Sequence, residues 1–197
     1  GRSTMSLGGW GDGLGKMLSK GAFNVGYALY KTRIGHQFHA AACSDGSAAP
    51  HSVQSDIPLI PGVHITVVPM LADNYCYLLV DSATKKCLAV DPADAAAVLA
   101  AVEAEGLDLL GILTTHTHWD HSGGNEAIKQ KLPGVKVYGG KLESIPGLTD
   151  AVGEGDTFLF PPRAGGAEPK IVVQVWEAPC HTVGHVMYVV NTQQKTP

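Results

Sequence analysis

Hydrophobic residues recur at short intervals along this chain from about residue 57 onwards. Short runs of branched and aromatic residues, separated by turn residues, predict β-strands. These strands are expected at residues 63–68, 75–80, 86–90, 109–114, 136–138, 157–160, 171–176 and 186–190. Residues 94–105 carry apolar side chains at helical spacing and predict a helix that ends at Gly106. Residues 126–132 predict a second, shorter helix that Pro133 stops. The order of these elements predicts a domain of mixed α/β structure.

Residues 1–57 differ in composition from the rest and predict an N-terminal extension and linker. Residues 1–42 are rich in Gly, Ser, Lys and Arg with one acidic residue, Asp12, and residues 43–56 are typical of a linker. Such an acid-poor stretch is compatible with an organelle-targeting remnant, an interfacial helix or an arm that docks a partner protein. A surface helix of no special role is an equal alternative. We expect a mitochondrial or cytoplasmic protein whose catalytic-type domain spans residues 58–197.

Four side chains that commonly bind metals lie within six residues, at His116, His118, Asp120 and His121. A divalent cation needs several N and O donors that converge within about 2.0–2.2 Å, and imidazole with carboxylate suits zinc or iron. An extended continuation of the strand at 109–114 points His116 and His118 to the same side. Asp120 and His121 are expected in the turn that follows. The spacing therefore predicts two adjacent metal positions at the carboxyl end of a strand.

The sequence around these residues resembles a known family. Residues 115–125, Thr-His-Thr-His-Trp-Asp-His-Ser-Gly-Gly-Asn, resemble the signature of the metallo-β-lactamase superfamily in the form of its glyoxalase II branch. Residues 178–185, Ala-Pro-Cys-His-Thr-Val-Gly-His, resemble that branch's next motif. Shorter matches occur in the expected order at residues 71–75, 90–92 and 137–140. The resemblance implies an αββα sandwich, of which this sequence holds the first half or so.

The resemblance also implies a role for each candidate ligand. His116, His118 and His181 would hold a first metal ion, while Asp120 and His121 would contribute to a second. Asp120 is in addition the expected catalytic residue. The implied cofactor is Zn²⁺, one or two ions per complete site, with iron or manganese as alternatives.

Two further polar residues have more than one interpretation in the sequence. The resemblance implies that Asp91 orients the ligands. An Asp-Pro pair after a strand is also ordinary turn chemistry, so both interpretations stay open. His185 is more typical of a histidine that packs beside a metal site than of a ligand.

Part of the family pattern is not in this sequence. Residues 186–197 hold neither Asp nor His, so the bridging aspartate, the last metal histidine and the glutathione-binding helices are missing. We expect three histidines and an open position at the first metal, and poor binding at the second. Half a sandwich would also leave a sheet face and strand edges uncovered. A partner protein or larger assembly could then be bound by that sheet or by residues 1–57.

These sequence features are compatible with three functions. The resemblance implies a thiolester hydrolase that converts S-D-lactoylglutathione to D-lactate and glutathione, impaired in these 197 residues alone. A non-catalytic structural or interaction subunit of the same descent is the first alternative. A superfamily relative such as a persulfide dioxygenase is the second, and Trp119 with the Gly-Gly-Asn run at 123–125 disfavours it. A formal charge of −4 argues against a nucleic-acid partner, and no run approaches the roughly 18 apolar residues of a membrane span.

Overall fold

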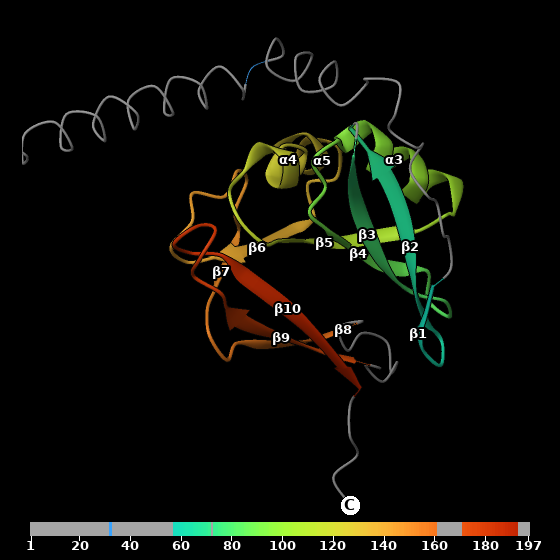
Figure 1. The fold of residues 1–197 in the computed structure, drawn as a ribbon. Coiled ribbons are helices and arrows are strands. Elements are labelled where there is room, and N and C mark those ends of the chain that lie inside the picture. Colours follow the sequence, from blue (N-terminus) through green and yellow to red (C-terminus); the bar gives the residue numbers. More distant parts are fainter. Residues whose placement is uncertain (1–31, 33–56, 72, 161–170, 193–197) are drawn as a thin grey trace, which may run out of the picture. The chain divides into compact units, whose positions relative to one another are not determined.

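The computed structural model describes Thr32 and residues 57–71, 73–160 and 171–192 (Figure 1). The extension predicted at residues 1–57 therefore lies outside the described residues, apart from Thr32 and Ile57. The domain itself consists of two β-sheets and three helices among the described residues. Within that part of the chain, no helix is both long and apolar enough to cross a membrane.

The larger sheet contains seven strands that lie side by side in sequence order. Four antiparallel strands come first: β1 (Ile57–Ile60), β2 (Val63–Met70), β3 (Asn74–Asp81) and β4 (Lys86–Val90). Three strands parallel to β4 follow: β5 (Asp108–Thr114), β6 (Lys136–Gly140) and β7 (Asp150–Val152). Because parallel neighbours end at the same edge of a sheet, the carboxyl ends of β4, β5 and β6 meet there. Asp91 follows β4, and the candidate ligands at residues 116–121 follow β5.

Helical crossovers make the parallel pairing possible, because two parallel strands cannot be joined by a tight turn. Helix α3 (Ala95–Ala104) connects β4 to β5, and Asp94 caps it by accepting hydrogen bonds from the amides of Ala96 and Ala97. Gly106, at a φ of +63°, follows the helix as predicted. Helices α4 (Trp119–Ser122) and α5 (Asn125–Lys131) connect β5 to β6.

The smaller sheet contains β8 (Thr157–Phe160), β9 (Ile171–Glu177) and β10 (Val186–Thr192), all antiparallel, in the order β10-β9-β8. Figure 1 shows the helices on one face of the larger sheet and the smaller sheet on the other. Side chains of β3 serve both faces in alternation: Leu78 and Val80 join the core beneath the helices, while Leu79 joins the core between the sheets. Among the described residues, three layers of the expected αββα sandwich are thus present: one layer of helices and the two sheets.

All eight predicted strands and both predicted helices are confirmed within a few residues, whereas β1 and β7 were not expected. The expectation of a bare sheet face does not hold for the larger sheet, because the smaller sheet covers much of the face opposite the helices. Phe160, Ile171 and Val173 are buried against the larger sheet. A cavity of about 300 Å³ remains between the sheets, beside Tyr77 and Met187.

Candidate metal centre

The candidate ligands lie in the segment that follows β5 of the larger sheet and in one loop of the smaller sheet. The first, residues 115–118, follows β5 and forms bends, so the predicted extended continuation is wrong. The imidazoles of His116 and His118 nevertheless meet, with ring centroids 4.7 Å apart, because the bends turn both inward. Asp120 and His121 lie in the helical turn α4, where a simple turn was expected. The second loop, residues 178–185, joins β9 to β10 and carries His181.

Three histidines form a compact cluster across these two loops. Candidate ligand nitrogens of His116, His118 and His181 all lie within 4.8 Å of one another. His118 Nδ1 and His181 Nε2 are 3.0 Å apart. His116 is only 2% exposed, and its Nε2 has no hydrogen-bond partner among the described residues. A buried polar atom without a partner is costly unless something else binds it.

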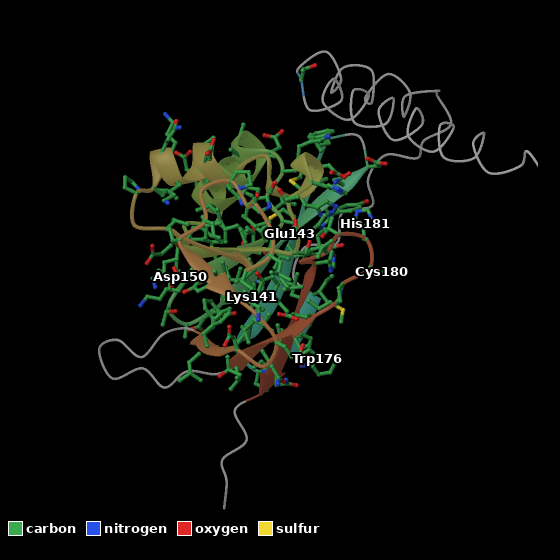
Figure 2. The ribbon with its side chains drawn as sticks, turned by 90° about the vertical axis from the view of Figure 1, so that its left-hand side faces the viewer. Lys141, Glu143, Asp150, Trp176, Cys180 and His181 are labelled. Carbon is green, nitrogen blue, oxygen red and sulfur yellow. The ribbon has the colours of Figure 1, made fainter. Side chains whose placement is uncertain are left out.

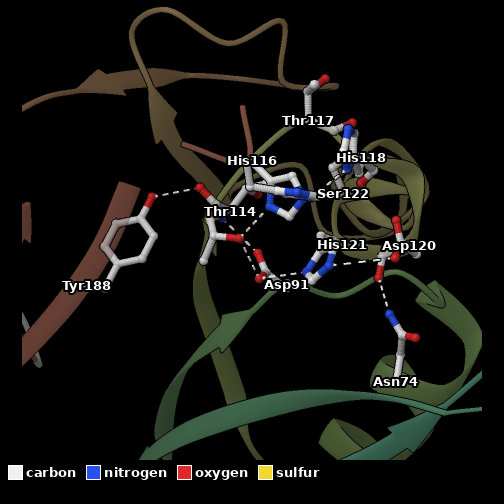
Figure 3. Close-up of polar contacts among 12 residues, drawn as sticks. Asn74, Asp91, Thr114, His116, Thr117, His118, Asp120, His121, Ser122 and Tyr188 are labelled. Atoms are coloured by element: carbon white, nitrogen blue, oxygen red, sulfur yellow. Dashed lines mark hydrogen bonds and ion pairs between the residues drawn. The ribbon is translucent and has the colours of Figure 1, made fainter. Parts of the chain in front are cut away.

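Asp91 fixes the hydrogen-bonding pattern of the His116 and His121 imidazoles (Figure 3). Its Oδ1 accepts a hydrogen bond from the Thr115 amide at 2.8 Å, and its Oδ2 accepts from the Thr115 hydroxyl at 2.7 Å. Since that hydroxyl donates its one proton to Asp91, it can only accept from His116 Nδ1, which lies 2.9 Å away. Nδ1 of His116 therefore carries the proton, and the lone pair sits on the orphaned Nε2. Asp91 Oδ2 also accepts from His121 Nδ1 at 3.0 Å, which leaves His121 Nε2 free for a second metal.

The backbone at Asp91 is unusual, with a φ of +51° that aspartate tolerates better than most residues. The carbonyl oxygen of Pro92, the residue after Asp91, accepts a hydrogen bond from the Gly124 amide at 2.9 Å. A Cβ added at Gly124 would lie 2.2 Å from that oxygen, so only glycine permits this approach. This contact packs the start of α5 against the backbone at Asp91 and Pro92.

Asp120 and His121 form a second pair beside the cluster. His121 Nε2 lies 3.6 Å from Asp120 Oδ2, and the rings of His121 and His116 are 4.3 Å apart. The side-chain amide of Asn74 donates to the Asp120 carbonyl oxygen at 2.7 Å and connects β3 to α4. This pair could contribute two ligands to a neighbouring metal position.

Comparison with known proteins places this geometry in a family. Residues 72–192, more than half of the chain, match the metallo-β-lactamase superfamily. The chain belongs to the metallo-β-lactamase superfamily. Within it, the chain is 45% identical over 127 residues to the cytoplasmic hydroxyacylglutathione hydrolase of Arabidopsis thaliana, which supports its place in the glyoxalase II branch. That match spans 64% of this chain and 46% of the relative, so the chain spans about half the length of the curated relative it matches.

Two solved metallo-β-lactamases support the fold alone. The class B3 di-zinc enzyme LRA-12 from an Alaskan soil metagenome has a TM-score of 0.53 at 17% identity, over 77% of this chain and 62% of that one. A metallo-β-lactamase from Staphylococcus aureus subsp. aureus COL has a TM-score of 0.52 at 20% identity, over 70% of this chain and 40% of that one.

The donor set fits the divalent metal that this superfamily implies. Nitrogens that share a tetrahedral ion at about 2.0–2.1 Å lie roughly 3.4 Å apart, so small ring rotations would bring the cluster into range. Burial, followed by the nearby histidines, lowers the pKa of His116 to about 3. Burial and His181 likewise lower the pKa of His118. Both imidazoles are thus held neutral, which is the form that binds a metal.

The pKa of His121 moves the other way. Burial lowers it, but the hydrogen bond to Asp91 and the charges of Asp91 and Asp120 outweigh burial and leave it above its ordinary value.

His185 lies outside the three-histidine group, with its ring 5.0 Å from that of His116 and 6.4 Å from that of His181. Its Nδ1 is buried without a partner among the described residues.

Sequence reasoning assigned no role to three residues that hold this site together. Thr115 and Asn74 stand inside stretches that resemble the family, so the motifs contained the signal. Glu143 lies outside every quoted motif, and its contacts with both loops become visible only in three dimensions.

Proposed function

We propose that this chain carries the metal site of a glyoxalase II type thiolester hydrolase, which converts S-D-lactoylglutathione to D-lactate and glutathione. One Zn²⁺ would be held by His116, His118 and His181, with iron or manganese as alternative metals. The observation that carries the proposal is the buried, unpartnered Nε2 of His116 inside a cluster of three imidazoles. The name of the 45% identical Arabidopsis relative supports the substrate class and a cytoplasmic location.

A second metal position would use Asp120 and His121. It has two protein ligands among the described residues, so we propose that it binds metal much more weakly than the first. Asp91 would support both positions, because it holds His116 through Thr115 and holds His121 directly. Ligand-orienting carboxylates of this kind raise metal affinity by fixing the ring and its tautomer.

The chemistry would be hydrolysis of the thioester carbonyl. A bound divalent cation supplies Lewis acidity and lowers the pKa of water towards neutrality. Asp120, half-buried beside the cluster, would orient the attacking water and accept its proton. The water oxygen bonds to the carbonyl carbon, and the carbon–sulfur bond breaks. A thiol has a pKa of about 8.5, so the thiolate leaves without strong acid assistance.

The test is hydrolysis of S-D-lactoylglutathione by the zinc-loaded chain, beside its His116→Ala and His64→Ala variants. His64 contacts Ser82 and is not a candidate ligand, so His64→Ala is a matched control. We expect metal-dependent turnover, slower than that of the Arabidopsis relative, that is lost in His116→Ala and retained in His64→Ala. Equal rates in the wild type and His116→Ala would contradict the proposal. A zinc-loaded chain without turnover would favour the non-catalytic subunit instead.

A further inference from the structure

His118 and His181 oppose each other from loops that are far apart in the sequence. The 115–118 loop and the 178–185 loop are joined directly by a hydrogen bond from the Val186 amide to the Thr115 carbonyl oxygen, at 3.0 Å. That bond lies at the base of both loops. Farther along the two loops, His118 Nδ1 and His181 Nε2 come within 3.0 Å of each other.

Glu143 provides a further connection between the two loops. Its Oε2 accepts a hydrogen bond from the Thr117 amide at 3.0 Å, and its Oε1 accepts from the Gly184 amide at 2.9 Å. Thr117 stands between two candidate ligands, and Gly184 stands three residues after His181. Glu143 and His181 lie in neighbouring parts of the domain (Figure 2). One half-buried carboxylate thus holds the backbone of both loops.

The segment that carries Glu143 is itself well fixed. It turns directly after β6, where the Glu143 amide donates to the Gly140 carbonyl oxygen at 2.9 Å. The Thr117 hydroxyl donates to the Ser144 carbonyl oxygen at 2.8 Å, which adds a second contact with the 115–118 loop. Gly184 packs so closely that an added Cβ would lie 2.9 Å from Glu143 Cγ. The segment that carries the carboxylate is therefore held by the end of β6 and by contacts with both loops.

We infer that Glu143 is a positioning residue that sets the spacing of His118 and His181. This inference rests on the proposed metal site. A carboxylate suits the task because each of its two oxygens accepts from one amide. Glutamine has the same shape, but its NH₂ group would face one of the two amides and cannot accept its hydrogen bond. Both oxygens of Glu143 are already used by backbone, and Glu143 is outside the three-histidine group.

The first measurement is Zn²⁺ affinity, by competition with a chromophoric chelator, for the full 197-residue chain. We expect Glu143→Gln to bind Zn²⁺ about tenfold more weakly and Glu143→Ala up to about a hundredfold more weakly. Glu105→Gln is the matched control, since Glu105 accepts a hydrogen bond from Thr66 at 3.2 Å, outside both loops. Glu105→Gln should lose no Zn²⁺ affinity even if its melting temperature falls as far as that of Glu143→Gln. Unchanged affinity in Glu143→Gln, or an equal loss in Glu105→Gln, would overturn the inference.

The second measurement is amide hydrogen exchange in the metal-free chain. If Glu143 holds the loops, Glu143→Gln should accelerate exchange at Thr117 or Gly184 relative to the strand amides of β5. Unchanged exchange at both amides would overturn the inference whatever the zinc result. A wild-type chain that binds no Zn²⁺ would refute the proposed function, while the exchange data would still decide whether Glu143 holds the loops.

Discussion

The hydroxyl of Thr115 connects Asp91 to His116 in the candidate site. Thr115→Val removes this hydroxyl with little change in side-chain shape. The hydroxyl donates to Asp91 at 2.7 Å and accepts from His116 at 2.9 Å. Its loss leaves the buried Nδ1 of His116 without a partner and deprives Asp91 of one of its three hydrogen bonds. A neutral hydrogen bond contributes about 1 kcal/mol and one to a charged group about 1.5–3 kcal/mol. We therefore expect the free energy of unfolding to fall by about 2–4 kcal/mol.

Zn²⁺ binding should weaken as well, because the ring of His116 is no longer held in the tautomer that presents Nε2 to the metal. Loss of such a partner costs about 10–100-fold in affinity, and each tenfold step is about 1.4 kcal/mol. Urea unfolding of the metal-free protein and chelator competition measure the two effects. Thr115→Ser retains the hydroxyl and is the control. If Val and Ser substitutions have equal effects on affinity, the tautomer argument is refuted.

Three further predictions concern activity, packing and thiol reactivity. Asp120→Ala should abolish any thioester hydrolysis with little change in circular dichroism, whereas retained turnover would remove Asp120 from the proposed chemistry. Phe160→Ala should lower the free energy of unfolding by about 3–5 kcal/mol in urea titrations, because Phe160 is 1% exposed between the sheets; a loss below about 1 kcal/mol would contradict that packing. Iodoacetamide at pH 8 should alkylate the exposed Cys180 and spare Cys76 and Cys87, as measured by peptide mass spectrometry. Burial raises the pKa of both buried thiols, that of Cys87 to about 12. Rapid alkylation of Cys76 would show that the core opens.

Much of the fold could be read from the sequence because local patterns determine it. Apolar runs such as residues 109–114 are buried strands whichever partners they have, and Asp94 caps a helix through contacts with its own neighbours. The strand β1 was missed because its exposed residues carry no period, and β7 is only three residues long. Both depend on pairing with a neighbour in the sheet.

The candidate site was predictable only in part, for a related reason. His116 to His121 lie close together in the sequence, so their clustering was evident, but the bends that orient them come from long-range contacts. Asp91 reaches Thr115 across 24 residues, and Glu143 reaches Gly184 across 41. A sequence pattern contains the residue types for such contacts and not their distances. The same holds for the smaller sheet, whose covering of the larger one was not foreseen.

The measurement that tests the central claim most directly is the zinc content of the purified chain after exhaustive dialysis. If His116, His118 and His181 form the site, the wild-type chain should retain one equivalent of Zn²⁺, and His116→Ala should retain none. His64→Ala should match the wild type, since His64 lies beside Ser82 and away from the cluster. A wild-type chain that holds no metal, or a His116→Ala chain that still holds a full equivalent, would contradict the account.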